Sequence, residues 1–466
     1  MTATFSGVNT ALRGLEAEQI AMNVSGQNTA NASTPGYSRQ LVNLQTTDPI
    51  SDPALGAAGP GQMGTGVQVT SITRAHDSFV QQQVIYQNGQ QSQLQTQSDT
   101  LSNISQIFNE PNGTTGFGTL LSNFFTAWQG LANSPTDPSQ QAVVAQRGAD
   151  LASGLNGASG SLQKLQQQNN AEIGGFVTQV NTLTGQIATL NQQIAEVTAV
   201  GQQPNDLKDK QDNLVNQLSR VVGVQATYQA NGTVNVSLAG SGTLVQGIQS
   251  HQLTTVPDAT QPQFTAVAFQ GQPGQIPISG GSLGGAITAR DQTLGGQLTT
   301  LNNLASNIAS GVNNLQSTGY GSNGATGIAF FTGTSAATLA LNPVIAADNT
   351  NIAASSAPNA PGDGSMATKI SQLQETPAAG QPTTLQNQYN AMITQLGVNG
   401  QQAQTNLSTG TLVLQQLTNQ QESVSSVSLN EEASNLMRYQ QAYDAATHVI
   451  SIMDQTISNM ITQLGG

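Results

Sequence analysis

The chain has 466 residues, of which only 8% are charged and 4% aromatic, and its formal net charge at pH 7 is −13. So few cations argue against nucleic acid or an anionic membrane as a partner, because both are bound through clustered Lys and Arg. The chain contains no cysteine, which excludes disulfides, zinc–thiolate sites and thiol nucleophiles. A surface rich in amides and hydroxyls but poor in charge suits extensive protein–protein contact, since few ions need desolvation on assembly.

The first residues contain neither the basic nor the apolar segment of a cleavable secretion signal. No run in the sequence reaches the roughly 18 to 20 apolar residues that span a membrane. We therefore expect no membrane insertion, and we expect export, if it occurs, to follow a route that needs no such signal.

Apolar residues recur at helical spacing through the first segment of the chain, from about residue 4 to residue 28. They are Phe5, Val8, Leu12, Leu15 and Met22. This helix is expected to end at a turn centred on Pro35 and Gly36, because Pro fixes φ at the second turn position and Gly accepts positive φ after it. Asn31 can satisfy the freed groups at the helix end. A short extended piece and a Gly- and Pro-rich linker follow, up to about residue 66.

Helical periodicity returns over residues 76–108 and 117–131. The second stretch has a broad apolar face around the only tryptophan, which we interpret as the core of a helix bundle. Asp137-Pro138 is a strong helix start, because an N-cap residue precedes a proline at the first helical position. A long helix and then a shorter returning helix over 207–221 follow, as in an antiparallel rod-like bundle.

At Gly223 the hydrophobic period changes from helical to two, which predicts a β-hairpin over 224–238 with a type I′ turn at Asn231-Gly232. Further short runs predict a small antiparallel β subdomain. These runs cover residues 242–245, 252–256, 264–269 and 275–278. Helical periodicity then resumes near Ser282.

The last segment, residues 429–464, carries two apolar rows that repeat at a seven-residue step. The first row is Leu429, Leu436, Tyr443, Ile450, Ile457 and Leu464, and the second is Tyr439, Ala446, Met453 and Met460. This is the a/d pattern of a coiled-coil seam. Ser428 and Glu431 read as a capping box that opens the helix, with the Glu431 carboxylate reaching back to the N–H of Ser428.

So narrow a stripe cannot bury itself, so we expect the N-terminal helix to be its partner. The alternative is that the two amphipathic helices dock separately on a globular core. The placement of the two stripes at the extreme ends of the chain, where most domains fray, favours pairing.

The sequence therefore predicts a mainly α protein with a small β subdomain. Its expected form is an elongated helical bundle whose N- and C-terminal helices pair as a coiled coil. The expected divisions are 1–60 (N-terminal half of the coiled-coil assembly domain and linker), 61–222 (helical bundle), 223–280 (β subdomain), 281–404 (helical return) and 405–466 (C-terminal half of the assembly domain). Within the helical return, residues 319–364 are loop-rich, and no separate outer domain is expected there.

We find no constellation of residues that predicts catalysis. The histidines His76, His251 and His448 lack a carboxylate or second His at metal-ligand spacing. Glu431 and Glu432 are adjacent on a helix and so diverge by about 100°. The glycine-rich stretch 280–285 lacks the Lys-Ser/Thr of a phosphate-binding loop. We therefore predict a non-enzyme with no catalytic, cofactor-binding or metal site.

Two terminal motifs carry a resemblance to a known family. Residues 30–40, Ala-Asn-Ala-Ser-Thr-Pro-Gly-Tyr-Ser-Arg-Gln, resemble the signature of the bacterial flagellar axial proteins, which form the rod, the hook and the hook-associated parts. Residues 427–433 and 435–443, and the central blocks 212–218 and 281–285, are similar to the hook-associated protein 1 family. Larger members of that family carry an outer β domain after the helix that ends here near Ser317, which this chain replaces with the loop-rich segment.

The resemblance implies a structural protein of the bacterial flagellum, which forms the junction ring between hook and filament on which the filament assembles. It implies secretion by flagellar type III export to the extracellular flagellum, self-assembly into a ring, and contact with the hook protein and the second junction protein. It also implies an export chaperone that binds the C-terminal region, and no nucleic acid, membrane or cofactor. The expected assembly interface consists of Leu12, Leu15, Met22, Asn31, Pro35, Gly36, Tyr37, Leu429, Leu436, Tyr439, Tyr443, Ile450 and Ile457.

Other assignments are weighed against this one. Another flagellar axial component, either the second junction protein or a hook or rod subunit, shares the general pattern. The second junction protein typically lacks the Thr-Pro-Gly-Tyr block, and hook subunits are richer in β modules. A type III secreted effector would need a membrane-active segment or a catalytic constellation, and the sequence contains neither.

Overall fold

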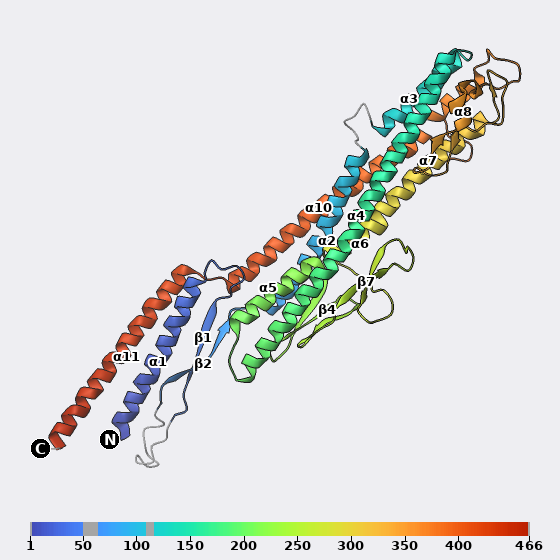
Figure 1. Ribbon diagram of the computed structural model, residues 1–466. Helices are drawn as coiled ribbons and strands as arrows, with labels where there is room; N and C mark the ends of the chain where they lie inside the picture. The colour runs from blue at the N-terminus through green and yellow to red at the C-terminus, as the bar shows by residue number, and fades with distance from the viewer. Residues whose placement is uncertain (1, 50–63, 109–115, 465–466) are drawn as a thin grey trace.

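The computed structural model describes residues 2–49, 64–108 and 116–464, which form a long, narrow molecule (Figure 1). The first and last helices lie side by side at one end, and the chain travels to the other end and back along helices. The predicted fold class is confirmed, since the molecule is mainly helical with small sheets and paired terminal helices. The expected boundary between residues 60 and 61 and the side chains of Phe5 and Leu464 lie outside the described residues, and the division into domains stays a prediction.

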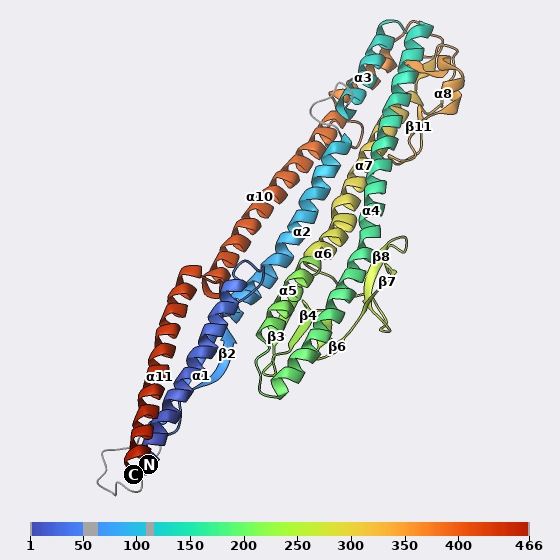
Figure 2. The same ribbon diagram turned by 60° about the vertical axis from the view of Figure 1, so that its left-hand side comes forward.

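Long helices make up the rod. They are α1 (Thr2–Ala30), α2 (Ser78–Phe108), α3 (Phe117–Asn133), α4 (Pro138–Ala199), α5 (Asn205–Val221), α6 (Gly281–Thr288), α7 (Gly295–Gln316), α9 (Ser365–Ser371), α10 (Leu385–Ser425) and α11 (Leu429–Leu464). In the lower part of the rod α10 packs along α2, α2 packs against α5 and α6, and α5 packs against α4 (Figure 2). The predicted start of α4 is confirmed, because the Asp137 carboxylate accepts from the backbone N–H of Ser139 at 2.8 Å.

An aromatic cluster fills the core at the end of the rod far from the termini. Phe124 and Trp128 of α3 contact Phe330 and Phe331, and the ring centroids of Trp128 and Phe330 lie 5.3 Å apart. Gly148 of α4 leaves the space for this packing, since a Cβ there would lie 2.4 Å from the Phe330 ring. The aromatic face of α3 is therefore core, as its periodicity indicated.

The segment 319–364, expected to be loop-rich, contains short regular elements. They are β9 (Tyr320–Gly321), β10 (Phe331–Thr332), β11 (Ala340–Leu341), α8 (Pro343–Ala347), a 3-10 turn (Asn349–Asn351) and β12 (Ala353–Ser355). Ile345 and Ile352 are buried with Phe330 in the same core as α3, α4 and α7. The segment is thus an extension of the rod's core, which the sequence did not reveal because its few apolar residues follow no regular period.

Small sheets cover one side of α4 and α5. β3 (Val224–Tyr228), β4 (Val234–Leu238), β5 (Gly242–Gln246) and β6 (Gln249–Ser250) form an antiparallel sheet, and β7 (Leu253–Pro257) pairs with β8 (Thr265–Phe269). The run expected at 275–278 is not a strand, although the N–H of Ile276 donates to the carbonyl of Val267 at 2.8 Å. The β3–β4 turn is not type I′, which needs positive φ at two residues: Gly232 has a φ of 82° but Asn231 does not have positive φ.

A π-helical turn (Ala289–Leu294) joins α6 to α7 and carries a buried arginine, Arg290. Its guanidinium donates to the Asn170 side chain at 2.8 Å and to the carbonyl of Thr265, and it pairs with Asp291 at 2.7 Å. Burial of this cation is tolerated because its nitrogens all find acceptors. The arginine thereby ties the β7–β8 hairpin to α4 and to the turn between α6 and α7.

Substitution of Phe330 by Ala tests whether the 319–364 segment belongs to the core. We expect Phe330→Ala to lower the free energy of unfolding by about 3–5 kcal/mol, because a fully buried ring is lost and the rigid surroundings leave a cavity. Denaturant unfolding followed by far-UV circular dichroism measures the change. The matched control is Val344→Ala, since Val344 lies in the same segment but is exposed, and we expect a change of about 0.5 kcal/mol or less. Equal effects of the two substitutions would contradict the assignment.

Candidate assembly site at the joined ends of the chain

α11 lies antiparallel to α1 and packs along it (Figure 1). Half-buried seam residues are Leu436, Tyr439, Tyr443, Ile450 and Ile457. On the opposing helix the Ser25 hydroxyl donates to the Glu432 carboxylate at 2.5 Å, and a Cβ at Gly7 would lie 2.5 Å from the Met453 side chain. The chain therefore pairs its two extreme ends, as the sequence predicted.

The face of α1 that meets α11 includes small residues, among them Gly7 and Ser25. Ala21 and Ser25, about one helical turn apart, are buried on this face, and their small side chains let the two helices come close. Leu12 is 45% exposed, whereas Leu15 and Met22 are half-buried. Met22 lies three residues before Ser25 and so on the same side of the helix. α1 therefore brings small residues into this contact and leaves Leu12 exposed, and the role of Leu12, Leu15 and Met22 in assembly stays a prediction.

A second face of α1 is covered by the hairpin of β1 (Gln40–Thr46) and β2 (Val67–Arg74). Ala17 and Val24 are buried, and the Arg13 guanidinium donates to the carbonyl of Thr65 at 3.3 Å. One face of α1 is covered by the hairpin and another by α11, and Leu12 is left exposed.

The start of α11 is tied to the turn after α1. The N–H of Glu431 donates to the Ser428 hydroxyl at 3.4 Å, which is one half of the expected capping box. The second half does not form, because the Glu431 carboxylate pairs with Arg39 at 2.8 Å instead of returning to Ser428. The backbone N–H of Arg39 also donates to the carbonyl of Ser425, at the end of α10, at 2.8 Å. Leu429, the first seam residue, is 56% exposed.

The turn itself has the geometry that its residues predict. The N–H of Tyr37 donates to the carbonyl of Thr34 at 3.2 Å, and Gly36 has a φ of 79°, which a residue with a Cβ adopts only under strain. The Tyr37 hydroxyl donates to the Asn28 side-chain oxygen at 2.9 Å, so the turn folds back on the end of α1. Pro35 lies exposed at the tip.

Asn28 and Asn31, near the end of α1, form different hydrogen bonds. The Asn28 amide pairs with both the N–H and the carbonyl of Gln40, each at 2.9 Å, and so fixes the start of β1. The Asn31 amide donates to the carbonyl of Gln27 at 3.0 Å, and the same carbonyl also accepts from the backbone N–H of Asn31.

A buried cluster of charges joins this turn to the rod, and we call Ser38, Arg74, Asp209 and Asp212 the Arg74 cluster. The N–H and the hydroxyl of Ser38 both donate to the Asp209 carboxylate, at 2.9 and 2.7 Å. Arg74, at the end of β2, donates to Asp209 at 2.8 Å and to Asp212 at 2.6 Å. The charged side chains are shielded from water, so their mutual pairing is what makes their burial tolerable.

The charges and the burial in this region shift several pKa values. Burial, reinforced by nearby carboxylates, raises the pKa of Tyr37 to about 12. Burial and the Arg74 cation lower the pKa of His76, although Asp212 lies 3.7 Å from its ring nitrogen and opposes the shift. The Tyr228 hydroxyl donates to Asp212 at 2.5 Å, and burial raises the pKa of this tyrosine well above its usual value. Neutral tyrosines and a neutral histidine near pH 7 suit a fixed hydrogen-bonded joint.

The Arg74 cluster was not predicted from the sequence. Arg74 lies 135 residues before Asp209 along the chain, so local spacing could not connect them. A signal was nevertheless present in α5, where Asp206, Asp209 and Asp212 recur at three-residue steps and therefore share one face. In a chain with few charges such a carboxylate row predicts a buried or interfacial cation.

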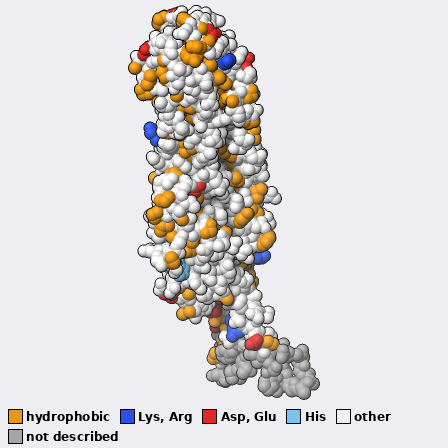
Figure 3. Space-filling view, turned by 90° about the vertical axis from the view of Figure 1, so that its right-hand side faces the viewer, with side chains coloured by type: hydrophobic (Ala, Val, Ile, Leu, Met, Phe, Trp, Pro, Cys, Tyr) orange, Lys and Arg blue, Asp and Glu red, His pale blue; other side chains and the backbone are white. Residues whose placement is uncertain are grey.

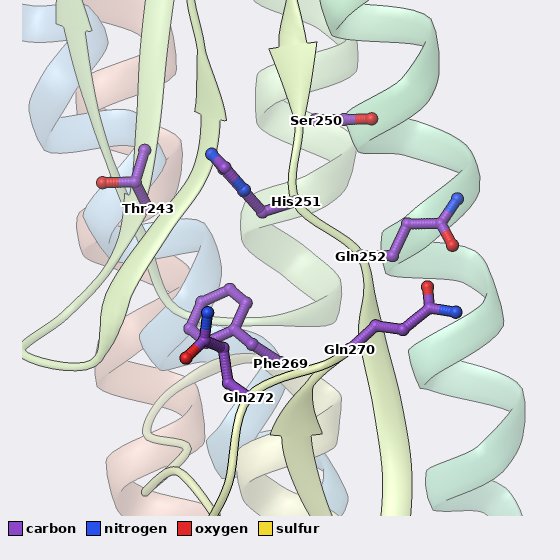
Figure 4. A pocket seen from close by; sticks show the side chains of 7 residues that line it. All are labelled: Thr243, Ser250, His251, Gln252, Phe269, Gln270 and Gln272. Carbon is purple, nitrogen blue, oxygen red and sulfur yellow. The ribbon is translucent and has the colours of Figure 1, made fainter.

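Two hollows in the described surface lie near the strands and under the turn. One of about 590 Å³ lies among the strands, with Thr243, His251 and Phe269 on one side and Gln252 and Gln270 on the other (Figure 4). No carboxylate or cation lines it. A second, of about 660 Å³, lies under the turn at residues 32–38, between the ends of α2, α5 and α10.

The described surface is poor in charge, and on the face shown in Figure 3 hydrophobic side chains are scattered among uncharged polar ones. Within residues 2–49, 64–108 and 116–464 no group of three or more His, Asp and Glu could hold a metal ion. None of the described helices combines the length and apolar character that crossing a membrane requires. The candidate functional site is the surface at the joined ends of the chain.

Comparisons with known proteins point the same way. The family described as "Flagellar hook-associated protein FlgK helical domain" matches residues 101–331, and the family described as "Flagella basal body rod protein" matches residues 8–37. Flagellar hook-associated protein 1 of Bacillus subtilis (strain 168) is 31% identical over 100% of this chain and 99% of its own length. The protein of the same name from Escherichia coli (strain K12) is 31% identical over 70% of this chain, which spans 59% of that relative. The structure of the flagellar hook junction protein FlgK from Burkholderia pseudomallei has the same fold, with a TM-score of 0.67 at 20% identity over 74% of this chain and 100% of that one.

The rod-like fold, the joined ends and the match to the rod-protein family at residues 8–37 define the class: a structural protein of the flagellar axis. Within that class, the relative that aligns over the full length is decisive. The chain belongs to the flagellar hook-associated protein 1 family, whose members are structural proteins of the hook–filament junction.

Removal of the Asp209 carboxylate tests whether the Arg74 cluster stabilises the folded chain. We expect Asp209→Ala to lower the free energy of unfolding by about 3–5 kcal/mol, because it leaves the buried Arg74 charge and the Ser38 N–H short of acceptors. Urea unfolding measures the change. The control is Asp444→Ala, an exposed carboxylate on α11, with an expected change of about 0.5 kcal/mol or less. If the Asp209 variant were as stable as the control, the Arg74 cluster would not stabilise the contact of the turn and β2 with α5.

The pH dependence of stability tests the environment of His76. Its pKa in the folded protein is lowered, so the unfolded chain binds a proton more readily and stability falls as the pH drops below about 6.5. We expect His76→Gln to remove this part of the acid sensitivity, and His251→Gln, at an exposed position, to retain it. Denaturant midpoints measured between about pH 7.5 and pH 5.5 report the difference. Parallel pH profiles for the two variants would refute the assignment.

Proposed function

We propose that the joined ends of this chain are the surface through which its copies assemble as the junction ring between hook and filament. The observation that supports this is the projection of the α1–α11 pair beyond the rod (Figure 1). Among the described residues the pair is packed on one side only, by the β1–β2 hairpin. Leu12 and Leu429 are exposed on it, and a pair of helices with uncovered apolar side chains is completed by packing against neighbours.

In this proposal the neighbours are other copies of the chain, with the hook protein on one side of the ring and the second junction protein on the other. The low charge of the surface supports such a role, because wide contacts then require little desolvation of ions. The protein acts as a structural adaptor at the extracellular end of the hook, without catalysis.

Type III export and a chaperone complete the proposal. A chain that travels unfolded needs protection of its apolar segments before assembly, and α11 has several that the folded chain leaves exposed. Met437, Ile452 and Ile461 lie outside the pair with α1. We infer that an export chaperone binds α11 through such residues and is displaced when the terminal helices pair.

The direct test is removal of the gene from the flagellated cell that carries it. We expect hooks without filaments, and flagellin in the medium, because the filament lacks the ring on which it assembles. Electron microscopy of the cells and analysis of the medium provide the readout, and return of the gene restores filaments. Normal filaments in the deletion strain would refute the proposed function.

A single substitution tests the terminal pair within this function. We expect Leu436→Asp to abolish filament formation while the α2–α10 rod keeps its helical circular dichroism, because a charge is placed in the α1–α11 contact. The matched control is Ser434→Asp, which adds the same charge at an exposed position two residues away. Filaments on cells with the Leu436 variant would show that the pair is not the joint.

A further inference from the structure

An aromatic ridge on α2 is left uncovered by the described part of the chain. Phe79 and Tyr86 lie seven residues apart, and so on the same side of the helix, and are 68% and 64% exposed. The opposite side of α2 faces the bundle: Ile85 is buried there, and the Gln81 amide donates to the side chain of Asn216 on α5 at 3.1 Å. Two large aromatic side chains in one exposed row are unusual for a surface with no partner.

Beside these aromatics, α10 contributes apolar side chains of its own. Val413 and Leu417 border a hollow of about 370 Å³ together with Phe79 and Tyr86. Its remaining lining consists of glutamines, with no charged side chain. We call these four apolar residues the aromatic ridge. Aromatic anchors surrounded by uncharged polar groups are the composition of the centre of a protein interface.

A groove of about 760 Å³ runs between the outer sides of α4 and α5. Leu190 and Leu214 are half-buried in it, Thr189 lies exposed at its wall, and Gly185 adds width because it has no side chain. Lys210 is the one charged residue that lines it. We call this the α4–α5 groove.

The ridge and the groove are placed so that neighbouring copies could use both at once. They lie at the same level of the rod, because Gln81 beside the ridge bonds to Asn216 beside the groove, and the α2–α5 contact stands between them. The groove is also continuous with the proposed assembly surface. Asn213 and Gln217 line the groove and also the hollow under the turn at residues 32–38.

We propose that the aromatic ridge of one copy docks into the α4–α5 groove of the next copy of this chain. The inference rests on the proposed function, since it requires several copies side by side. A second copy is the occupant because the two surfaces are different and lie on different sides of the rod, which is the arrangement that repeats head to tail and closes into a ring. A contact of this kind places Phe79 and Tyr86 against Leu190 and Leu214.

The charges beside the two surfaces also favour docking of the ridge of one copy into the groove of the next. Asp77 lies at the foot of the ridge, where its carboxylate accepts from the N–H of Phe79 at 2.9 Å. Lys210, at the wall of the groove, is exposed and forms no ion pair within the described residues. Docking of the ridge brings an acidic helix start toward a basic groove wall, whereas two ridges or two grooves would bring like charges together.

Thiol crosslinking tests this contact without background, because the natural chain has no cysteine. The variant carries Tyr86→Cys and Thr189→Cys, both at exposed positions, and replaces the natural chain in the flagellated cell. Treatment of isolated hook–filament junctions with a short bifunctional thiol reagent is expected to give a ladder of covalent oligomers. Each single variant is expected to stay monomeric, because one copy then presents its thiol to a surface that has none.

The matched control pairs Tyr86→Cys with Val398→Cys, a similarly exposed position farther along α10, and is expected to give no ladder. Junctions that contain the double variant but give no ladder would overturn the proposal, as would dimers from the Tyr86→Cys single variant, which indicate ridge against ridge. A crosslink from Tyr86→Cys to a different flagellar protein would assign the ridge to that protein and also overturn it.

A second variant keeps the proposal testable if the cysteine variants fail to assemble. Phe79→Ser with Tyr86→Ser is expected to keep the circular dichroism of the monomer and to lose most of the filaments, whereas Val398→Ser keeps both. Normal filaments with the serine variant would refute the docking. These outcomes are separate from the proposed function, which fails if the deletion strain forms normal filaments or if the natural chain does not restore them.

Discussion

The pairing of Arg74 with Asp209 and Asp212 is the interaction on which the arrangement of the two ends depends. An arginine removed from water needs its full charge compensated, so β2 has to end where α5 presents its carboxylates. Because Asp209 also accepts both hydrogen bonds from Ser38, the same carboxylate fixes the turn that leaves α1. The direction of α1 relative to the rod follows from these contacts.

Three of the arginines form ion pairs at contacts between different elements of the fold. Arg39 holds the start of α11 through Glu431, Arg74 holds the hairpin to α5, and Arg290 holds a strand to the turn between two helices. In each case the cation links segments that are distant along the chain or belong to different elements. Much of the remaining surface consists of amides and hydroxyls, whose hydrogen bonds are exchanged with water or with a neighbouring subunit at little cost. Such a division gives a rigid subunit with wide, uncharged contact surfaces.

The parts of this structure that the sequence predicted are those with large apolar side chains at a regular step. The row that contains Leu436 and Tyr443 predicted both the helix and its partner. The part that Ala21 and Ser25 of α1 play was not predicted, because these residues carry almost no hydrophobic signal, although their small size permits close packing. The Arg74 cluster was not predicted for a different reason: its members come together only through the fold.

The position of the seam decides how its residues act in assembly. Leu436, Tyr443 and Ile450 are half-buried against α1 within one chain, so they are not free to bind a neighbour. We infer that they act in assembly by holding the pair together, whereas exposed residues such as Leu12 and Leu429 supply the contacts between copies. A substitution in the first group therefore disturbs the shape of the subunit end, and one in the second disturbs only its fit to the next subunit. Mutations of the two groups can have the same effect on the filament and still differ in the stability of the isolated chain.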